Sequence, residues 1–229
     1  MATVQFLGHA AFYVEGNGIK ALIDPFLSGN PQASETSEKI SELAPNYIFV
    51  THAHQDHLGD TISIAQKTGA TVVATNELAM YLQGKGLNVV GMHVGGRKQF
   101  DFGGVKLTAA FHGSSVSEEG VLVCSDTPCG FLIEVDGKKI YHAGDTGLTV
   151  EMTLLEEEKV DVALLPIGGH YTMDIRDAVR AVGFIKPQKV VPMHYNTFPP
   201  VKADPSEFKN LVGGKSDVVI LNPGEKINL

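Results

Sequence analysis

The sequence contains few of the features that mark a membrane protein, a secreted protein or a disulfide-rich fold. Its only cysteines are Cys124 and Cys129, too few for a disulfide framework, so we expect two reduced structural thiols and a cytoplasmic location. No apolar run approaches the ~20 residues that a membrane-spanning helix needs. The N-terminus also lacks the basic and apolar regions of a signal peptide.

Clusters of basic residues and sequence repeats are absent as well. The formal net charge is -8 and the Lys and Arg residues are scattered, which argues against nucleic-acid binding through a basic face. The chain has no low-complexity segment, linker or fixed-period repeat. Hydrophobic residues make up 43% and charged residues 19%, the balance of a globular protein, so we expect one domain over residues 1–229.

Short apolar stretches dominate the chain, and most of them end at Gly, Pro, Asn or Asp, as strands do. Residues 133–141 (IEVDGKKIY) predict a hairpin with Asp136 and Gly137 in a tight turn. Helical periodicity appears in residues 59–69, 76–86, 173–187 and 204–214. Strands come first and later alternate with helices, which predicts an α/β sandwich of two sheets with helices on the outside.

The stretch VTHAHQDHLGD, residues 50–60, follows an apolar strand and is dense in metal-binding side chains. His52 and His54 are two positions apart, so an extended backbone points both imidazoles in the same direction. Asp56 and His57 follow at the turn into a helix. Zinc, manganese and iron all accept imidazole together with carboxylate, so we interpret the stretch as a metal-binding turn rather than a polar loop.

Further donors of the same kind lie at the ends of later apolar stretches. His112 ends VKLTAAFH, Asp145 lies in YHAGDTG, and His194 ends KVVPMH. Each of these residues alone would more often be a hydrogen-bonded structural residue. With the donors of residues 52–57 they make seven, too many for one tetrahedral ion, which predicts two divalent ions. Strand alternation separates His142 from Asp145, so we expect His142 to be structural.

The order and spacing of these seven residues resemble the ligand series of the metallo-β-lactamase superfamily along almost the whole chain. The segments FLGHAAF, LIDPF, LLPIGGHYTMD and PMHYNTFP further resemble a branch of small metal-dependent hydrolases similar to ascorbate-6-phosphate lactonase and N-acyl-phosphatidylethanolamine phospholipase D. The resemblance implies an αββα sandwich of two mixed sheets with a dinuclear site at one edge. It assigns His52, His54 and His112 to metal one, Asp56, His57 and His194 to metal two, and Asp145 to a bridge.

The resemblance also implies an enzyme. Two divalent ions, zinc or else manganese or iron, would share and activate a hydroxide, with Asp56 counted among the catalytic residues. Asp56 and Asp145 would leave the site positively charged, so we expect a hydrolase for a small anionic ester, lactone or phosphodiester. A nuclease or nucleotide phosphodiesterase on the same fold, and a non-catalytic metal-binding regulatory protein, are the alternatives. Relatives of this kind commonly self-associate, which implies a homo-oligomer.

Five other residues are candidates for roles around the metals. His9 follows the first strand, and it is expected either to be structural or to contact the substrate as a proton donor. His170 is expected to bind the substrate and take part in catalysis, while Tyr171 and Asn196 are expected to bind the substrate. Asp24 ends a strand, where it would either orient a ligand imidazole or cap the turn before Pro25.

Overall fold

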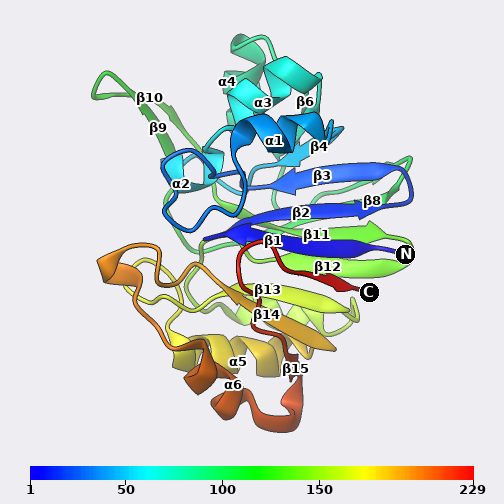
Figure 1. Cartoon of the computed structure of the whole chain (residues 1–229), viewed down its shortest axis with the longest axis vertical. Helices are drawn as coiled ribbons and strands as arrows, with labels where there is room; N and C mark the ends of the chain where they lie inside the picture. The colour runs from blue at the N-terminus through cyan, green and yellow to red at the C-terminus, as the bar shows by residue number, and fades with distance from the viewer.

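Two seven-stranded sheets lie face to face in the computed structural model, which describes residues 1–229 (Figure 1). The first sheet has the strand order β16-β1-β2-β3-β4-β5-β6, and β3 to β6 run parallel. Its strands are β1 (Thr3–Gly8), β2 (Ala11–Gly16), β3 (Ile19–Ile23), β4 (Tyr47–Phe49), β5 (Thr71–Thr75), β6 (Val89–Met92) and β16 (Lys226–Asn228).

The second sheet has the order β15-β14-β13-β12-β11-β8-β7, and β12 to β15 run parallel. Its strands are β7 (Arg97–Phe100), β8 (Gly103–Ala109), β11 (Cys129–Val135), β12 (Lys138–His142), β13 (Val162–Pro166), β14 (Lys189–Met193) and β15 (Asp217–Val218). Every residue of β13 is buried, because both faces of a parallel sheet are covered, which explains its unbroken apolar sequence VALLP.

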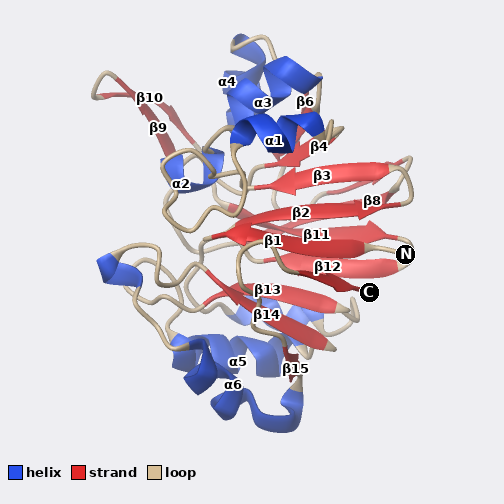
Figure 2. Cartoon of the chain, viewed as in Figure 1, coloured by secondary structure: helices blue, strands red, loops and turns tan.

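Three apolar clusters hold the layers together. The largest has 25 buried residues and lies between the sheets, where the rings of Phe49 and Phe131 pack edge to face at 5.3 Å. The other two clusters cover the outer faces of the two sheets. Helices complete these outer layers, as Figure 2 shows, and none of them has both the length and the apolar character to cross a membrane.

The helices divide between the two outer faces. On the first sheet lie α1 (Ser37–Glu42), α3 (Thr61–Thr68) and α4 (Asn76–Gly84), and the short α2 (Gln55–Leu58) follows β4. On the second sheet lie η1 (Val150–Leu155), α5 (Ile175–Ile185) and α6 (Pro205–Val212). Two further single turns are η2 (Pro199–Val201) and η3 (Gly213–Lys215).

This architecture confirms the predicted αββα sandwich. The four predicted helices appear as α3, α4, α5 and α6, and the hairpin β11–β12 turns at Asp136 and Gly137, both with positive φ. The prediction missed α1, β7, β16 and the hairpin of β9 (Ser115–Glu118) and β10 (Val121–Ser125), which projects from the sheets in Figure 1. The segments α1, β7, β9 and β16 are short and carry no clear apolar pattern, whereas β10 has the apolar sequence VLVCS but is mostly exposed.

A substitution at Gly59 tests how the fold supports the metal-binding turn. Gly59 ends α2, the helix that carries Asp56 and His57. Its φ is +43°, and a Cβ at this position would lie 2.7 Å from Cα of Phe26. Gly59→Ala should therefore push α2 away from the loop after β3. We expect it to lower both the free energy of unfolding in urea and the metal content measured by elemental analysis.

Gly69 provides the matched control, because it ends α3 with φ +75° and a Cβ there would meet nothing within 4 Å. Gly69→Ala should cost only the left-handed backbone strain, about 1–2 kcal/mol, and leave metal content unchanged. Equal metal content in the two variants would show that the packing of α2 against the loop after β3 does not support the metal-binding turn.

Candidate metal centre

The segments that follow the strands of both sheets bring metal-type donors together. The structure contains three groups of side chains whose ligand atoms all lie within 4.8 Å of one another. The groups are His52, His54 and His112, then His52, His57 and Asp145, then His9, Asp56, His57 and His194. Each of the seven ligand candidates from the sequence belongs to at least one group, and His9 joins them.

Local structure explains how residues 50–60 present four donors. His52 follows β4, and His54 is the N-cap of α2 with an extended backbone. Asp56 and His57 are neighbours in α2, where successive side chains diverge by about 100°. His57 therefore turns toward Asp145, while Asp56 turns toward other donors of the third group.

Asp145 lies between the donor groups and is only 3% exposed. Its Oδ1 is 3.2 Å from Nε2 of His57, and its Oδ2 is 3.1 Å from Nε2 of His194. The same Oδ2 is 3.6 Å from Nε2 of His112. One carboxylate thus faces imidazoles from all three groups, the position in which a bridging ligand would lie.

Several buried atoms of this cluster make no well-aligned hydrogen bond, although Nε2 of His57 and Oδ1 of Asp145 lie 3.2 Å apart. They are Nε2 of His57, Oδ1 of Asp145 and both ring nitrogens of His194. An unpaired buried polar atom costs about 1–3 kcal/mol, and a charged one costs more. A divalent cation would satisfy Nε2 of His57, Nε2 of His194 and Oδ1 of Asp145, while Nδ1 of His194 lies on the other side of its ring. Zinc, manganese and iron all accept imidazole and carboxylate ligands. The residues present therefore fit a metal centre.

Asp24 orients two of the imidazoles, His57 directly and His52 through Thr51. Its Oδ2 accepts hydrogen bonds from Nδ1 of His57 and from the hydroxyl of Thr51, both at 2.7 Å. Oγ1 of Thr51 is also 3.0 Å from Nδ1 of His52. Because this hydroxyl already donates to Asp24, Nδ1 of His52 must donate to the hydroxyl. Both rings therefore turn Nε2 toward the centre, the usual arrangement behind a metal-bound histidine.

Burial and the nearby carboxylates shift the pKa values of the imidazoles in opposite directions. Burial lowers the pKa of three of them, His52, His54 and His112. Burial also acts on His57 and His194, but there the carboxylate of Asp145 and a second carboxylate outweigh it. The pKa of His194 rises to about 9 and that of His57 rises as well. A metal ion would compete with protons at these two rings.

The sequence leaves open whether His9 is structural or contacts the substrate, and the structure places its ring among the donors. The side chain is fully buried, and its Nε2 is 3.2 Å from Oδ2 of Asp56. Its Nδ1 is 2.7 Å from Oγ1 of Thr197, and its ring centroid is 4.0 Å from that of His194. Burial lowers the pKa of His9 to about 4, which keeps this imidazole neutral near pH 7.

His170 and Tyr171 lie on the loop after β13, outside every donor group. Both side chains are exposed, and their rings meet edge to face at 4.4 Å. The loop is held beside the Asp145 segment, because the backbone N–H of Met173 donates to the carbonyl of Thr146 at 2.9 Å. These two side chains are therefore open to solvent and belong to none of the donor groups.

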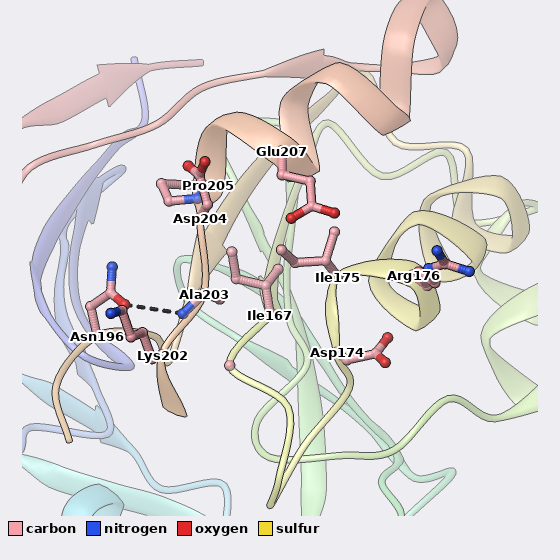
Figure 3. Close-up of a pocket in the computed structure, with 11 residues that line it drawn as sticks. Ile167, Asp174, Ile175, Arg176, Asn196, Lys202, Ala203, Asp204, Pro205 and Glu207 are labelled. Carbon is pink, nitrogen blue, oxygen red and sulfur yellow. Dashed lines mark hydrogen bonds between the residues drawn. The ribbon is translucent and has the colours of Figure 1, made fainter. Parts of the chain in front are cut away.

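Asn196 lies on the loop after His194, beside a cavity of ≈ 650 Å³. Its Oδ1 accepts a hydrogen bond from the backbone N–H of Ala203 at 3.0 Å (Figure 3). Gly168, Lys202 and the first residues of α5 and α6 also line this cavity, and no member of the donor groups does. The cavity thus adjoins the loops after β13 and β14 but does not contain the metal donors.

Three supporting residues have no signal in the sequence, because partners distant along the chain define them. They are Gln32, Thr51 and Thr197. Gln32 and Thr197 hydrogen-bond to His9 and to each other, and Thr51 hydrogen-bonds to Asp24 and His52.

Both ring nitrogens of His142, in contrast, hydrogen-bond to the backbone. They lie 2.9 Å from the carbonyl of Ala10 and 3.1 Å from the N–H of Gly144. His142 is structural, as strand alternation predicts.

Left-handed backbone occurs at several positions in and near the donor segments. Five non-glycine residues here have φ between 46° and 59°, namely His9, Asp24, His170, His194 and Asn196. This conformation costs roughly 1–2 kcal/mol for each such residue. Strained backbone of this kind persists where the surrounding structure enforces it, which is common at functional sites.

Comparison with known proteins agrees with this geometry. Residues 3–194 match the model of the beta-lactamase superfamily domain. A UPF0173 metal-dependent hydrolase from Alkaliphilus metalliredigens is 53% identical over 225 residues, which cover 98% of this chain and 99% of that protein. A second, from Pyrococcus furiosus, is 50% identical over the full length of both chains.

A solved structure supports the same assignment. Igni18, described as a novel metallo hydrolase from the archaeon Ignicoccus hospitalis, is 41% identical and superposes with a TM-score of 0.89. The match covers 99% of this chain and 97% of Igni18. The chain therefore belongs to the beta-lactamase superfamily and is a metal-dependent hydrolase with the metallo-β-lactamase fold.

Proposed function

We propose that this hydrolase works with two divalent metal ions, zinc or else manganese or iron. The supporting observation is that ring nitrogens of His57 and His194 and one oxygen of Asp145 are buried without a well-aligned hydrogen bond. One ion would be held by His52, His54 and His112 and the other by Asp56, His57 and His194. Asp145 would contact both, because its two oxygens face imidazoles of both sets.

The chain's own side chains would prepare this site before the substrate arrives. Two divalent ions lower the pKa of water and polarise the bond to be cleaved. Asp24 and Thr51 hold His57 and His52 in a fixed orientation, so the ligands need not reorganise during the reaction. The side chain of Asp56 is 31% exposed, which makes it the carboxylate of the centre best placed to accept a proton from an entering water molecule.

The substrate that we propose is a small anionic ester, lactone or phosphodiester. Two divalent ions bring four positive charges and Asp56 and Asp145 remove two, so the site stays positive within a chain of net charge -8. Such a site favours an anionic or strongly polarised oxygen. His170, Tyr171 and Asn196 would contact the rest of the substrate from the exposed loops that follow β13 and β14.

Metal analysis followed by an activity screen tests this proposal. Protein purified without chelator should approach two metal equivalents per chain. It should then hydrolyse at least one of the four bond types tested: ester, lactone, thioester and phosphodiester. A stable limit at one equivalent in excess metal would contradict the dinuclear site. Cleavage of RNA with a steep salt dependence would favour a nuclease instead.

A comparison of Asp145→Ala with His142→Gln separates a metal ligand from a buried neighbour. Asp145 faces the donors of both ions, whereas both ring nitrogens of His142 hydrogen-bond to backbone groups. We expect Asp145→Ala to lose bound metal and to lower kcat by at least ~10²-fold, the scale of removing one electrostatic group from an active site. His142→Gln should keep both ions. Equal losses in two folded variants would show that Asp145 has no special role.

His170→Ala tests the assignment of the exposed loop to substrate binding. All seven proposed ligands remain in this variant, so both ions should stay bound while kcat falls by ~10²–10³-fold. His54→Ala is the comparison, because it removes a proposed ligand and should lose metal as well as rate. Wild-type kinetics in His170→Ala would mean that the side chain takes no part in the reaction.

A further inference from the structure

The hydrogen bonds around His9 determine which of its ring nitrogens carries the proton. They begin at Gln32, whose Nε2 donates to the carbonyl of Tyr195 at 3.2 Å. Its Oε1 accepts from the backbone N–H of His9 at 3.4 Å. A carbonyl can only accept and a backbone N–H can only donate, so these two contacts determine the orientation of the Gln32 amide.

The hydroxyl of Thr197 comes next. Its Oγ1 is 2.9 Å from Oε1 of Gln32, an acceptor, so the hydroxyl donates its single proton there. Nδ1 of His9 is 2.7 Å from the same Oγ1 and must therefore donate to it. If the hydroxyl donated to Nδ1 instead, Oγ1 of Thr197 and Oε1 of Gln32 would be two acceptors in contact. The neutral imidazole of His9 thus carries its proton on Nδ1.

Nε2 of His9 is then a bare acceptor that faces another acceptor, Oδ2 of Asp56, at 3.2 Å. A charge-assisted N–H···O bond would be shorter, at about 2.7–2.9 Å. Two ligands of one zinc ion, each about 2.0–2.1 Å from it and separated by about 90–110°, lie about 2.8–3.4 Å apart. The observed distance lies within the range for two ligands of one ion and is longer than a typical charge-assisted hydrogen bond.

The rest of the surroundings agree with a shared ion. Nε2 atoms of His194 and His57 lie 3.7 Å and 3.9 Å from the same Oδ2 of Asp56. The backbone carbonyl of His9 accepts from the N–H of His194 at 2.8 Å, so the two histidines are held together by the main chain as well. His9 also keeps a left-handed φ of 59°, which its contacts must enforce.

We propose that His9 binds metal through Nε2, as an additional ligand of the second metal position, the one formed by Asp56, His57 and His194. The inference rests on the dinuclear site proposed above. It gives that position one more neutral imidazole without changing the charge of the site. It also gives Gln32 and Thr197 a role, because they set the tautomer that leaves Nε2 free to ligate, as Asp24 and Thr51 do for the other rings.

Nuclear magnetic resonance of cadmium-loaded protein tests this directly. The full chain, with isotope-labelled histidine nitrogens, is saturated with an NMR-active cadmium isotope, and the bound equivalents are counted by elemental analysis. We expect a proton on Nδ1 of His9 and a scalar coupling between its Nε2 and cadmium. The ring of His142, bonded only to the backbone, should show no such coupling. His9→Gln identifies the His9 signals, and His9→Asn serves if that variant does not fold, because Asn tolerates positive φ.

The possible outcomes separate this inference from the proposed function. Two cadmium equivalents with a coupled Nε2 of His9 would support both. Two equivalents with an uncoupled or protonated Nε2 would overturn the role of His9 and leave the dinuclear site intact, because His9 would then only hydrogen-bond to Asp56. One equivalent with an uncoupled His9 would overturn both.

Discussion

The site depends on one electrostatic constraint: imidazole nitrogens and carboxylate oxygens face one another in a space that excludes most water. Nε2 of His57, Oδ1 of Asp145 and the ring nitrogens of His194 are buried without a well-aligned hydrogen bond. Such an arrangement is unfavourable until a positive charge enters it, because each buried atom has given up its hydrogen bonds to water. The same constraint favours the binding of a cation.

The sandwich must hold this unfavourable arrangement in place. The core of 25 buried residues between the sheets supplies a rigid base, and the donors lie on the segments that follow β4, β8, β12 and β14. Buried hydrogen bonds then fix the individual rings. Asp24 and Thr51 orient two of them, and Gln32 and Thr197 orient His9. Left-handed backbone at Asp24, His9 and His194 is part of the cost of this geometry.

Burial separates two kinds of histidine that look alike in the sequence. His9 is fully buried against donors, whereas His170 is exposed on a loop beside the Asp145 segment. A buried ring in a fixed orientation can bind a metal ion or hydrogen-bond to a metal ligand. An exposed ring can contact a substrate. We therefore place substrate recognition on the exposed loops after β13 and β14, because binding residues are often carried by loops on a rigid scaffold.

The sequence alone was sufficient for the sandwich, its four main helices and the β11–β12 hairpin, because apolar periodicity and turn residues are local signals. It also indicated seven candidate donors, since His52, His54, Asp56 and His57 lie within six positions and the others end or follow apolar stretches. Tertiary structure alone decided the surroundings of His9. Thr197 lies 188 residues away from it in the chain, and no local pattern encodes a contact at that distance. Whether a histidine side chain faces metal, backbone or solvent depends on the packing of segments that the sequence does not place side by side.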